Sequence, residues 1–219
     1  MRWLDFLFPP RTDEAAVRDI SIDDFLALVA PRLVPETRPG TVALLPFNNS
    51  HVRAAIHEAK YHGSERAFAF LAAALSEYLR DADDICTTRF NLVTRLNLVV
   101  LIPIPLGKER HKERGFNQVE EVARRAAREL TITVDATLLE RTRETVSQVS
   151  LPRHEREKNM RGAFLASPKL EERRRAGNAS TYTYIVIDDV LTTGATLQAA
   201  ISALQKVGAG HIIPLALAH

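Results

Sequence analysis

Two neighbouring aspartates, Asp188 and Asp189, follow a short apolar run near the end of the chain. The run, residues 185–187, is β-branched and unbroken, which is typical of a strand buried on both faces of a parallel sheet. We expect this strand to end at the aspartates. Carboxylates at that point can accept hydrogen bonds from two adjacent ribose hydroxyls or help to hold a hydrated Mg²⁺ ion. Asp188 and Asp189 are therefore the candidate catalytic and ribose-binding residues.

A loop rich in hydroxyl groups comes next, and its residues are candidates for binding a phosphate: Thr192, Thr193, Gly194, Ala195 and Thr196. A glycine lets the backbone approach a ligand closely, and threonine hydroxyls add hydrogen-bond donors. The apolar spacing of residues 197–204 predicts a helix directly after the loop. The unpaired N–H groups and positive dipole end of that helix suit a phosphate dianion. The alternative is an ordinary acidic turn whose threonines cap the next helix.

Strand and helix patterns alternate along most of the chain. Apolar runs predict further strands at 42–47, 98–102, 132–134 and 212–217, and periodic segments predict helices at 51–60, 64–79 and 117–130. This alternation is typical of an α/β fold, with a parallel sheet flanked by helices and right-handed crossovers. The charged segment 169–180 is expected to be a surface loop. We divide the chain into a short N-terminal cap, residues 1–45, and a main domain, residues 46–219.

The segment 184–196 resembles the phosphoribosyl pyrophosphate (PRPP) motif of the type I phosphoribosyltransferases. Further blocks are similar to those of the ComF family of competence-associated proteins, namely residues 60–63, 103–106, 114–118, 148–151 and 156–164. The resemblance covers most of residues 56–219. It implies a type I phosphoribosyltransferase-like fold in which the acidic pair holds the ribose hydroxyls and the loop wraps the 5′-phosphate of PRPP. It also implies Mg²⁺, bound through the ligand.

Basic residues after the strand 98–102 are candidates for binding pyrophosphate. Loops that follow neighbouring strands of such a sheet face one crevice, and in the similar family this loop cradles pyrophosphate. The candidates here are Pro105, Lys108, Arg110 and Arg114, since arginine can bind two phosphate oxygens at once. Residues 148–161 take the place of the family's mobile hood, whose closure excludes water. Asn159 and Arg161 are the candidate contacts there, and a solvated charged surface is the alternative for both segments.

The chain departs from the ComF pattern at its N-terminus. ComF proteins commonly carry a four-cysteine zinc module after a Phe-Pro-Pro element, but here Phe8–Arg11 is followed by threonine and aspartate. Cys86 is the one cysteine, so a thiolate zinc site cannot form. The histidines are scattered, and His57 and His62 have the wrong spacing for one helical face. We expect no zinc and no metal ligands from the protein itself, with the N-terminal segment held by apolar contacts instead.

Composition and charge indicate an ordinary globular protein. Of the 219 residues, 46% are hydrophobic and 26% charged, and 29 basic against 27 acidic side chains give a net charge of +2. This balance gives no global case for a polyanionic partner. We expect no signal peptide, because the N-terminal apolar run is short and contains an aspartate, and the longest apolar run, residues 98–106, is too short to span a bilayer. We expect a cytoplasmic protein without membrane insertion.

Three functions follow from these patterns and the resemblance. The first is a ComF-like protein that binds PRPP or a related phosphosugar and serves DNA uptake in natural transformation, with a competence helicase or other DNA-uptake proteins as partners. The second is a metabolic phosphoribosyltransferase that acts on a nucleobase or amine acceptor. The third is a non-catalytic, ligand-sensing module that contacts a helicase or single-stranded DNA. Direct DNA binding has the least support, because no aromatic series separates the basic residues.

Overall fold

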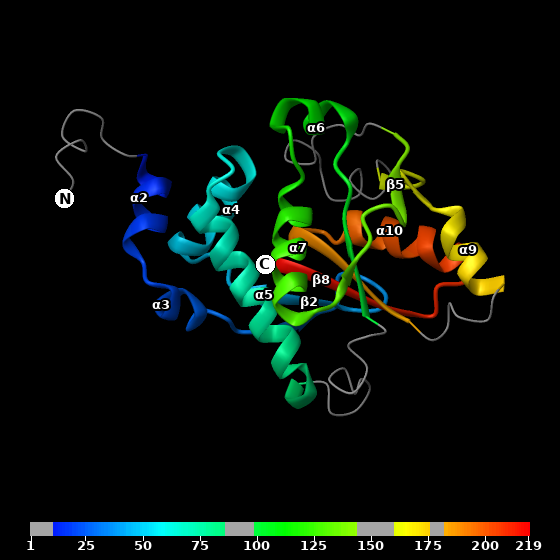
Figure 1. Ribbon diagram of the computed structural model, residues 1–219, viewed down its shortest axis with the longest axis horizontal. Coiled ribbons are helices and arrows are strands. Elements are labelled where there is room, and N and C mark those ends of the chain that lie inside the picture. The colour runs from blue at the N-terminus through cyan, green and yellow to red at the C-terminus, as the bar shows by residue number, and fades with distance from the viewer. Residues whose placement is uncertain (1–10, 86–98, 144–159, 176–181) are drawn as a thin grey trace.

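The computed structural model describes residues 11–85, 99–143, 160–175 and 182–219. Among these residues, six strands form one sheet, in the order β1 (Arg32–Val34), β2 (Thr41–Leu45), β8 (His211–Ala218), β7 (Thr183–Val190), β3 (Val99–Pro103) and β4 (Thr133–Val134). Neighbours from β2 to β4 run parallel, and β1 is an antiparallel edge strand. The mostly parallel sheet flanked by helices confirms the predicted α/β fold (Figure 1).

The central strand β7 is covered on both faces, as its unbroken apolar run predicts. Successive side chains of a strand point to opposite faces. Ile185 and Ile187 accordingly belong to one hydrophobic core, while Tyr184 and Val186 belong to the other. The sheet therefore lies between two separately packed layers.

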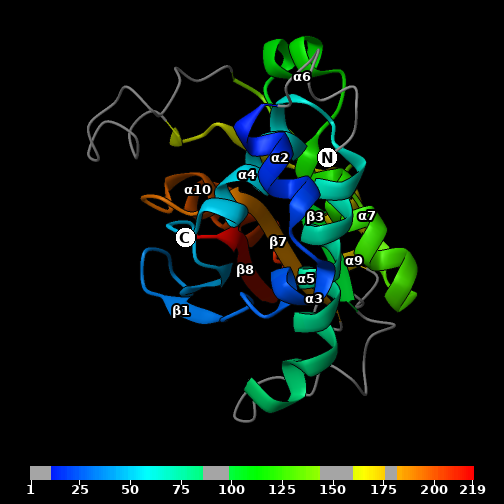
Figure 2. The ribbon, with the colours of Figure 1, turned by 90° about the vertical axis from the view of Figure 1, so that its left-hand side faces the viewer.

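The first layer consists of α4 (Ser50–Tyr61), α5 (Glu65–Ile85) and α7 (Gln118–Leu130). Outside it, α2 (Thr12–Asp19) packs on α4 and α3 (Ile22–Leu26) packs on α5 (Figure 2). The second layer contains α10 (Ala195–Lys206) and a small sheet of β5 (Leu139–Arg141) and β6 (Phe164–Ala166), followed by α9 (Pro168–Arg175). None of the described helices combines the length and the apolar character that a membrane crossing requires.

Several elements differ from those that the sequence predicts. Strand β7 does not end at the aspartates but continues through both to Val190, because its ladder with β8 extends to the pair Val190 and Ala218. The segment predicted as a surface loop, 169–180, begins inside helix α9. The basic segment after β3 is also helical, forming α6 (Lys108–Arg114), which ends at Gly115 in the left-handed conformation.

The strand predicted at 42–47 is β2, and it pairs with the C-terminal strand β8. Val42 lies opposite Leu215, and Leu45 lies opposite Ala218. Residues 41–45 therefore belong to the same sheet as the rest of the α/β fold. The predicted boundary between an N-terminal cap and a main domain at residue 45 stays a prediction. The ladder between β2 and β8 joins residues on both sides of that boundary.

Candidate functional site

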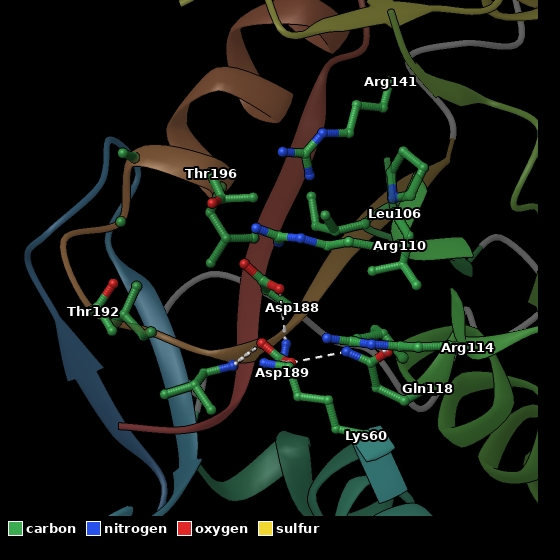
Figure 3. Close-up of a pocket in the computed structure, with 18 of the residues that line it drawn as sticks. Lys60, Leu106, Arg110, Arg114, Gln118, Arg141, Asp188, Asp189, Thr192 and Thr196 are labelled. Atoms are coloured by element: carbon green, nitrogen blue, oxygen red, sulfur yellow. Dashed lines mark hydrogen bonds and ion pairs between the residues drawn. The ribbon is translucent and has the colours of Figure 1, made fainter. Parts of the chain in front are cut away.

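A pocket of about 380 Å³ opens at the carboxyl ends of β3 and β7 (Figure 3). One wall comes from Ile104–Leu106, directly after β3, and another from the end of β7 with the loop that follows it. The backbone N–H of Ile104 donates to the carbonyl of Ile187 over 2.9 Å, which holds the two loops together. The loops after the two strands thus face one crevice, as expected for parallel strands.

The two aspartates have different surroundings because β7 continues through them. Asp189 points toward the layer of α4 and α7, where the Lys60 Nζ lies 3.0 Å from its Oδ2 and the Gln118 Nε2 donates to the same oxygen over 2.9 Å. Asp188 points to the opposite side, toward Arg110 (Figure 3). Its Oδ1 accepts from the backbone N–H of Asp189 over 2.9 Å. Asp188 therefore presents its carboxyl group to the pocket, while Asp189 is held by protein groups.

These surroundings shift the pKa values of the two carboxyls in opposite directions. Burial and the neighbouring charge of Asp189 raise the pKa of Asp188 to about 7. Burial also opposes ionisation of Asp189, but the charge of Lys60 and the hydrogen bonds from Lys60 and Gln118 more than offset it. The pKa of Asp189 is therefore lowered. Near neutral pH, Asp189 is therefore a carboxylate, whereas Asp188 is partly protonated.

The loop predicted to bind phosphate leads directly into α10. Gly194, with φ 72°, occupies the position before the first helical residue, and no side chain caps the helix. The first N–H groups of α10 thus have no side-chain partner from the capping residue and suit an anion. Thr192 and Thr196 line the pocket with Gly194. Thr193 lines a second cavity on the other side of the loop. Its hydroxyl oxygen is buried and has no hydrogen-bond partner in the described structure.

Gly194 also has a packing role that the sequence does not reveal. A Cβ atom on Gly194 would lie 2.8 Å from Cγ2 of Thr37 and 2.9 Å from the carbonyl oxygen of Glu36. Both belong to the turn between β1 and β2, and the backbone N–H of Arg38 in that turn donates to Oε1 of Gln198 on α10 over 2.8 Å. Glycine therefore allows the turn to press against the loop.

Helix α6 separates the basic candidates into two groups. Arg110 and Arg114 are four positions apart, so they share one face and line the pocket. Lys108 lies instead in an adjoining groove of about 570 Å³ together with Lys112, while Pro105 lines both cavities. Arg114 is held by Gln118, whose Oε1 accepts from its NH1 over 3.2 Å. Two guanidinium groups therefore reach the pocket from this helix.

Several further residues of the pocket were not identified as site residues from the sequence, among them Lys60, Gln118 and Arg141. Arg141, on β5, packs over the Phe164 ring at 5.6 Å and extends toward Asp188 (Figure 3). Lys60 and Gln118 lie within blocks that carry the ComF resemblance, so these blocks could have identified them as site residues. Arg141 has no such signal, because only the tertiary structure brings β5 to the pocket at the end of β7.

Of the two candidates from the predicted hood, only Arg161 lies in the described part of the chain, and it does not line this pocket. Arg161 lines a second cavity of about 600 Å³ with Arg38 and Lys206, on the other side of the loop that contains Gly194. Asn159 and residues 148–158 lie outside the described residues, as do Cys86 and the N-terminal residues 1–10. The hood therefore stays a prediction.

Comparison with known proteins agrees with this architecture. Residues 114–218 match the family model of the phosphoribosyl transferase domain. The matched range contains α7, the acidic pair, the glycine loop and α10. The chain thus contains a phosphoribosyltransferase domain, the class that its sheet and helices indicate.

Several curated relatives extend the match toward the N-terminus. The DNA utilization proteins YhgH of Escherichia coli K12 and Shigella flexneri are each 30% identical to the chain over 158 residues, which cover 72% of this chain and 62% of theirs. Competence protein F of Haemophilus influenzae is 33% identical over 114 residues, 51% of this chain and 46% of that protein. These similarities to DNA utilization and competence proteins agree with the resemblance to the ComF family. The chain spans less than two thirds of the length of these relatives.

Proposed function

We propose that the pocket binds PRPP together with Mg²⁺, and that the protein uses this ligand in the handling of DNA that a cell takes up. One observation carries the proposal. An acidic pair, an uncapped helix N-terminus and three guanidinium groups meet in a single pocket of about 380 Å³. PRPP carries a ribose with two adjacent hydroxyls, a 5′-phosphate and a pyrophosphate, so each part of the ligand has a chemically matched part of the site.

The assignment of ligand groups follows from charge and hydrogen-bond chemistry. The N–H groups at the start of α10 suit the 5′-phosphate, and the free side of Asp188 suits a ribose hydroxyl. Arg110, Arg114 and Arg141 suit the pyrophosphate, because guanidinium groups bind phosphate oxygens in pairs. Mg²⁺ enters with the pyrophosphate, and its water molecules find acceptors in the carboxylates.

The biological role is inferred from the relatives, which are named for DNA utilization and for competence. On this proposal the protein acts in the cytoplasm, where DNA arrives after uptake, and works with a competence helicase or other DNA-uptake proteins. Transfer of the phosphoribosyl group to a nucleobase or amine is the competing function. This function uses the same pocket, but it requires that the protein convert PRPP to products rather than only bind it.

Isothermal titration calorimetry with PRPP and Mg²⁺ tests the ligand. Asp188→Asn is the cleaner variant, because replacing Asp189 also leaves Lys60 without its partner. We expect Asp188→Asn to weaken binding at least about 10-fold, the loss of one hydrogen bond to a charged group. Asp81→Asn, on the exposed part of α5, is the control. Unchanged affinity in Asp188→Asn would contradict the proposal.

Helix α6 provides a matched pair for the pyrophosphate. Arg110→Gln removes a cation that lines the pocket, and Lys112→Gln removes one from the adjoining groove of the same helix. Only the first should weaken binding of inorganic pyrophosphate. Release of pyrophosphate from PRPP with a panel of nucleobases and amines then distinguishes a transferase from a protein that binds PRPP without turnover.

A further inference from the structure

Two histidines and a glutamate come together at the end of α4, on the side that packs against α2. The potential ligand atoms of His57, Glu58 and His62 all lie within 4.8 Å of one another. Their spacing does not place both histidines on one face of a continuous helix, but the helix does not continue through both. The helix ends at Tyr61, and His62 follows it with φ −124° and ψ −4°. This change in backbone direction brings the His62 ring back beside the last helical turn.

Glu58 gives the cluster an unusual feature, a buried carboxylate with one oxygen unused. Its side chain is only 3% exposed. The Oε2 atom accepts from NH2 of Arg11 over 3.1 Å, but the Oε1 atom is buried and has no hydrogen-bond partner in the described structure. A buried charged oxygen without a partner is costly. It indicates that something with positive charge belongs there.

The distance between Glu58 and His62 suits a metal ion as the positively charged partner of this oxygen. The Nε2 atom of His62 lies 3.9 Å from Oε1 of Glu58, which is too long for a hydrogen bond. Two atoms that share a tetrahedral zinc ion each lie about 2.0–2.2 Å from the metal and so roughly 3.4 Å from each other. We propose that His57, Glu58 and His62 form a binding site for a divalent transition-metal ion of the zinc class, separate from the PRPP pocket.

His57 is already oriented as a metal ligand usually is. Its Nδ1 lies 3.0 Å from Oδ2 of Asp13 on α2, which leaves Nε2 available for a metal. Histidine ligands commonly donate their second ring N–H to a carboxylate in this way. Two imidazoles and one carboxylate, with water in the fourth position, are a donor set that suits Zn²⁺. Because Asp13 comes from α2, the ion would fasten α2 to α4.

Arg11 is the competitor for this site. Its NH1 lies 3.0 Å from Nδ1 of His62. A guanidinium only donates, so Nδ1 accepts and the proton of the neutral ring is on Nε2. If the metal binds Nε2 of His62, the ring proton moves to Nδ1, which can then no longer accept from Arg11. If the metal binds Nδ1, it takes the place of the Arg11 contact. In both cases Arg11 is released from His62. Its side chain is 52% exposed and can turn to Glu14, 3.7 Å away.

The experiment titrates tag-free, chelator-treated protein with Zn²⁺ alone at pH 7.5 and measures binding by calorimetry. A parallel titration with Co²⁺ reports the ligand set through its absorption spectrum. We expect one ion per chain. His57 and His62 are partly exposed, so the variants His57→Ala and His62→Ala should fold. Each should lose more Zn²⁺ affinity than the roughly 10–100-fold that the loss of an outer-shell partner costs. Asp13→Asn should lose about 10–100-fold. Arg11→Met should bind more tightly than the natural protein.

Two controls keep the result specific to this cluster. His51→Ala removes a histidine from the other end of α4 and should leave Zn²⁺ binding unchanged. Asp188→Asn tests whether the ion binds at the acidic pair instead, and it should also have no effect. The proposal is overturned if Zn²⁺ affinity is unchanged in the double variant His57→Ala/His62→Ala, or if neither the natural protein nor Arg11→Met binds one ion. Both outcomes are independent of whether the protein binds PRPP.

Discussion

Asp188 and Asp189 are adjacent in the chain, but the alternation of a β-strand gives them opposite neighbours. Asp189 meets Lys60 and Gln118 from the helical layer, whereas Asp188 faces the pocket and the arginines. One carboxyl is consequently held in its charged form, and the other has a pKa raised to about 7. At the scale of single residues, the site combines a fixed negative charge with a group that changes charge near neutral pH.

This difference predicts a pH-dependent stability effect of Asp188→Asn. Below the ordinary pKa of an aspartate, Asp188 is protonated in both the folded and the unfolded protein. As pH rises toward about 7, only the unfolded protein releases the proton, so the folded state loses stability, by about 1.4 kcal/mol for each unit of the shift. The variant lacks this loss. In urea unfolding, the free energy of unfolding of the variant relative to that of the natural protein should therefore be larger at pH 8 than at pH 5. A difference that does not change with pH would contradict the assignment.

At the scale of elements, the contact between the β1–β2 turn and the start of α10 positions the phosphate loop. Gly194→Ala should lower stability through the left-handed φ, which costs a non-glycine residue about 1–2 kcal/mol, and through the close approach to Thr37 and Glu36. The clash should add about 1–3 kcal/mol. Binding of inorganic phosphate should weaken as well, because relief of the clash moves the loop.

Gly162 provides the matched control for this prediction. It also has a positive φ, 70°, but a Cβ there would have no neighbour within 4 Å. Gly162→Ala should thus show the backbone cost alone. Urea unfolding of both variants measures the difference, and equal destabilisation would mean that the turn yields and that Gly194 serves only the ligand.

At the scale of the whole molecule, the sheet unites the N-terminal and C-terminal parts of the chain. Strand β2 forms a parallel ladder with β8, and Leu215 and Leu217 of β8 are buried beneath the first helical layer. A chain that begins at residue 46 would lose this ladder and expose the edge of β8. It should show no cooperative thermal transition by circular dichroism, whereas a chain that begins at residue 11 should keep one. Cooperative unfolding of the shorter chain would support a domain boundary at residue 45.

The sequence by itself predicts the parallel α/β fold, most of the helices and the strand–loop–helix order around the acidic pair. These features depend on local chemistry: β-branched runs favour strands, apolar periodicity favours helices, and a glycine with hydroxyl residues before a helix suits an anion. The ComF resemblance is also readable from contiguous blocks. Such signals need no knowledge of what lies across the molecule.

Only the tertiary structure decides which groups face one another. It brings Lys60 from α4 and Arg141 from β5 to the two aspartates of β7. The helical conformation of α6 likewise selects Arg110 for the pocket and turns Lys108 away from it. The histidine cluster forms because α4 ends before His62. Each of these outcomes depends on contacts between segments far apart in sequence or on where a helix stops, and residue types and spacing alone encode neither.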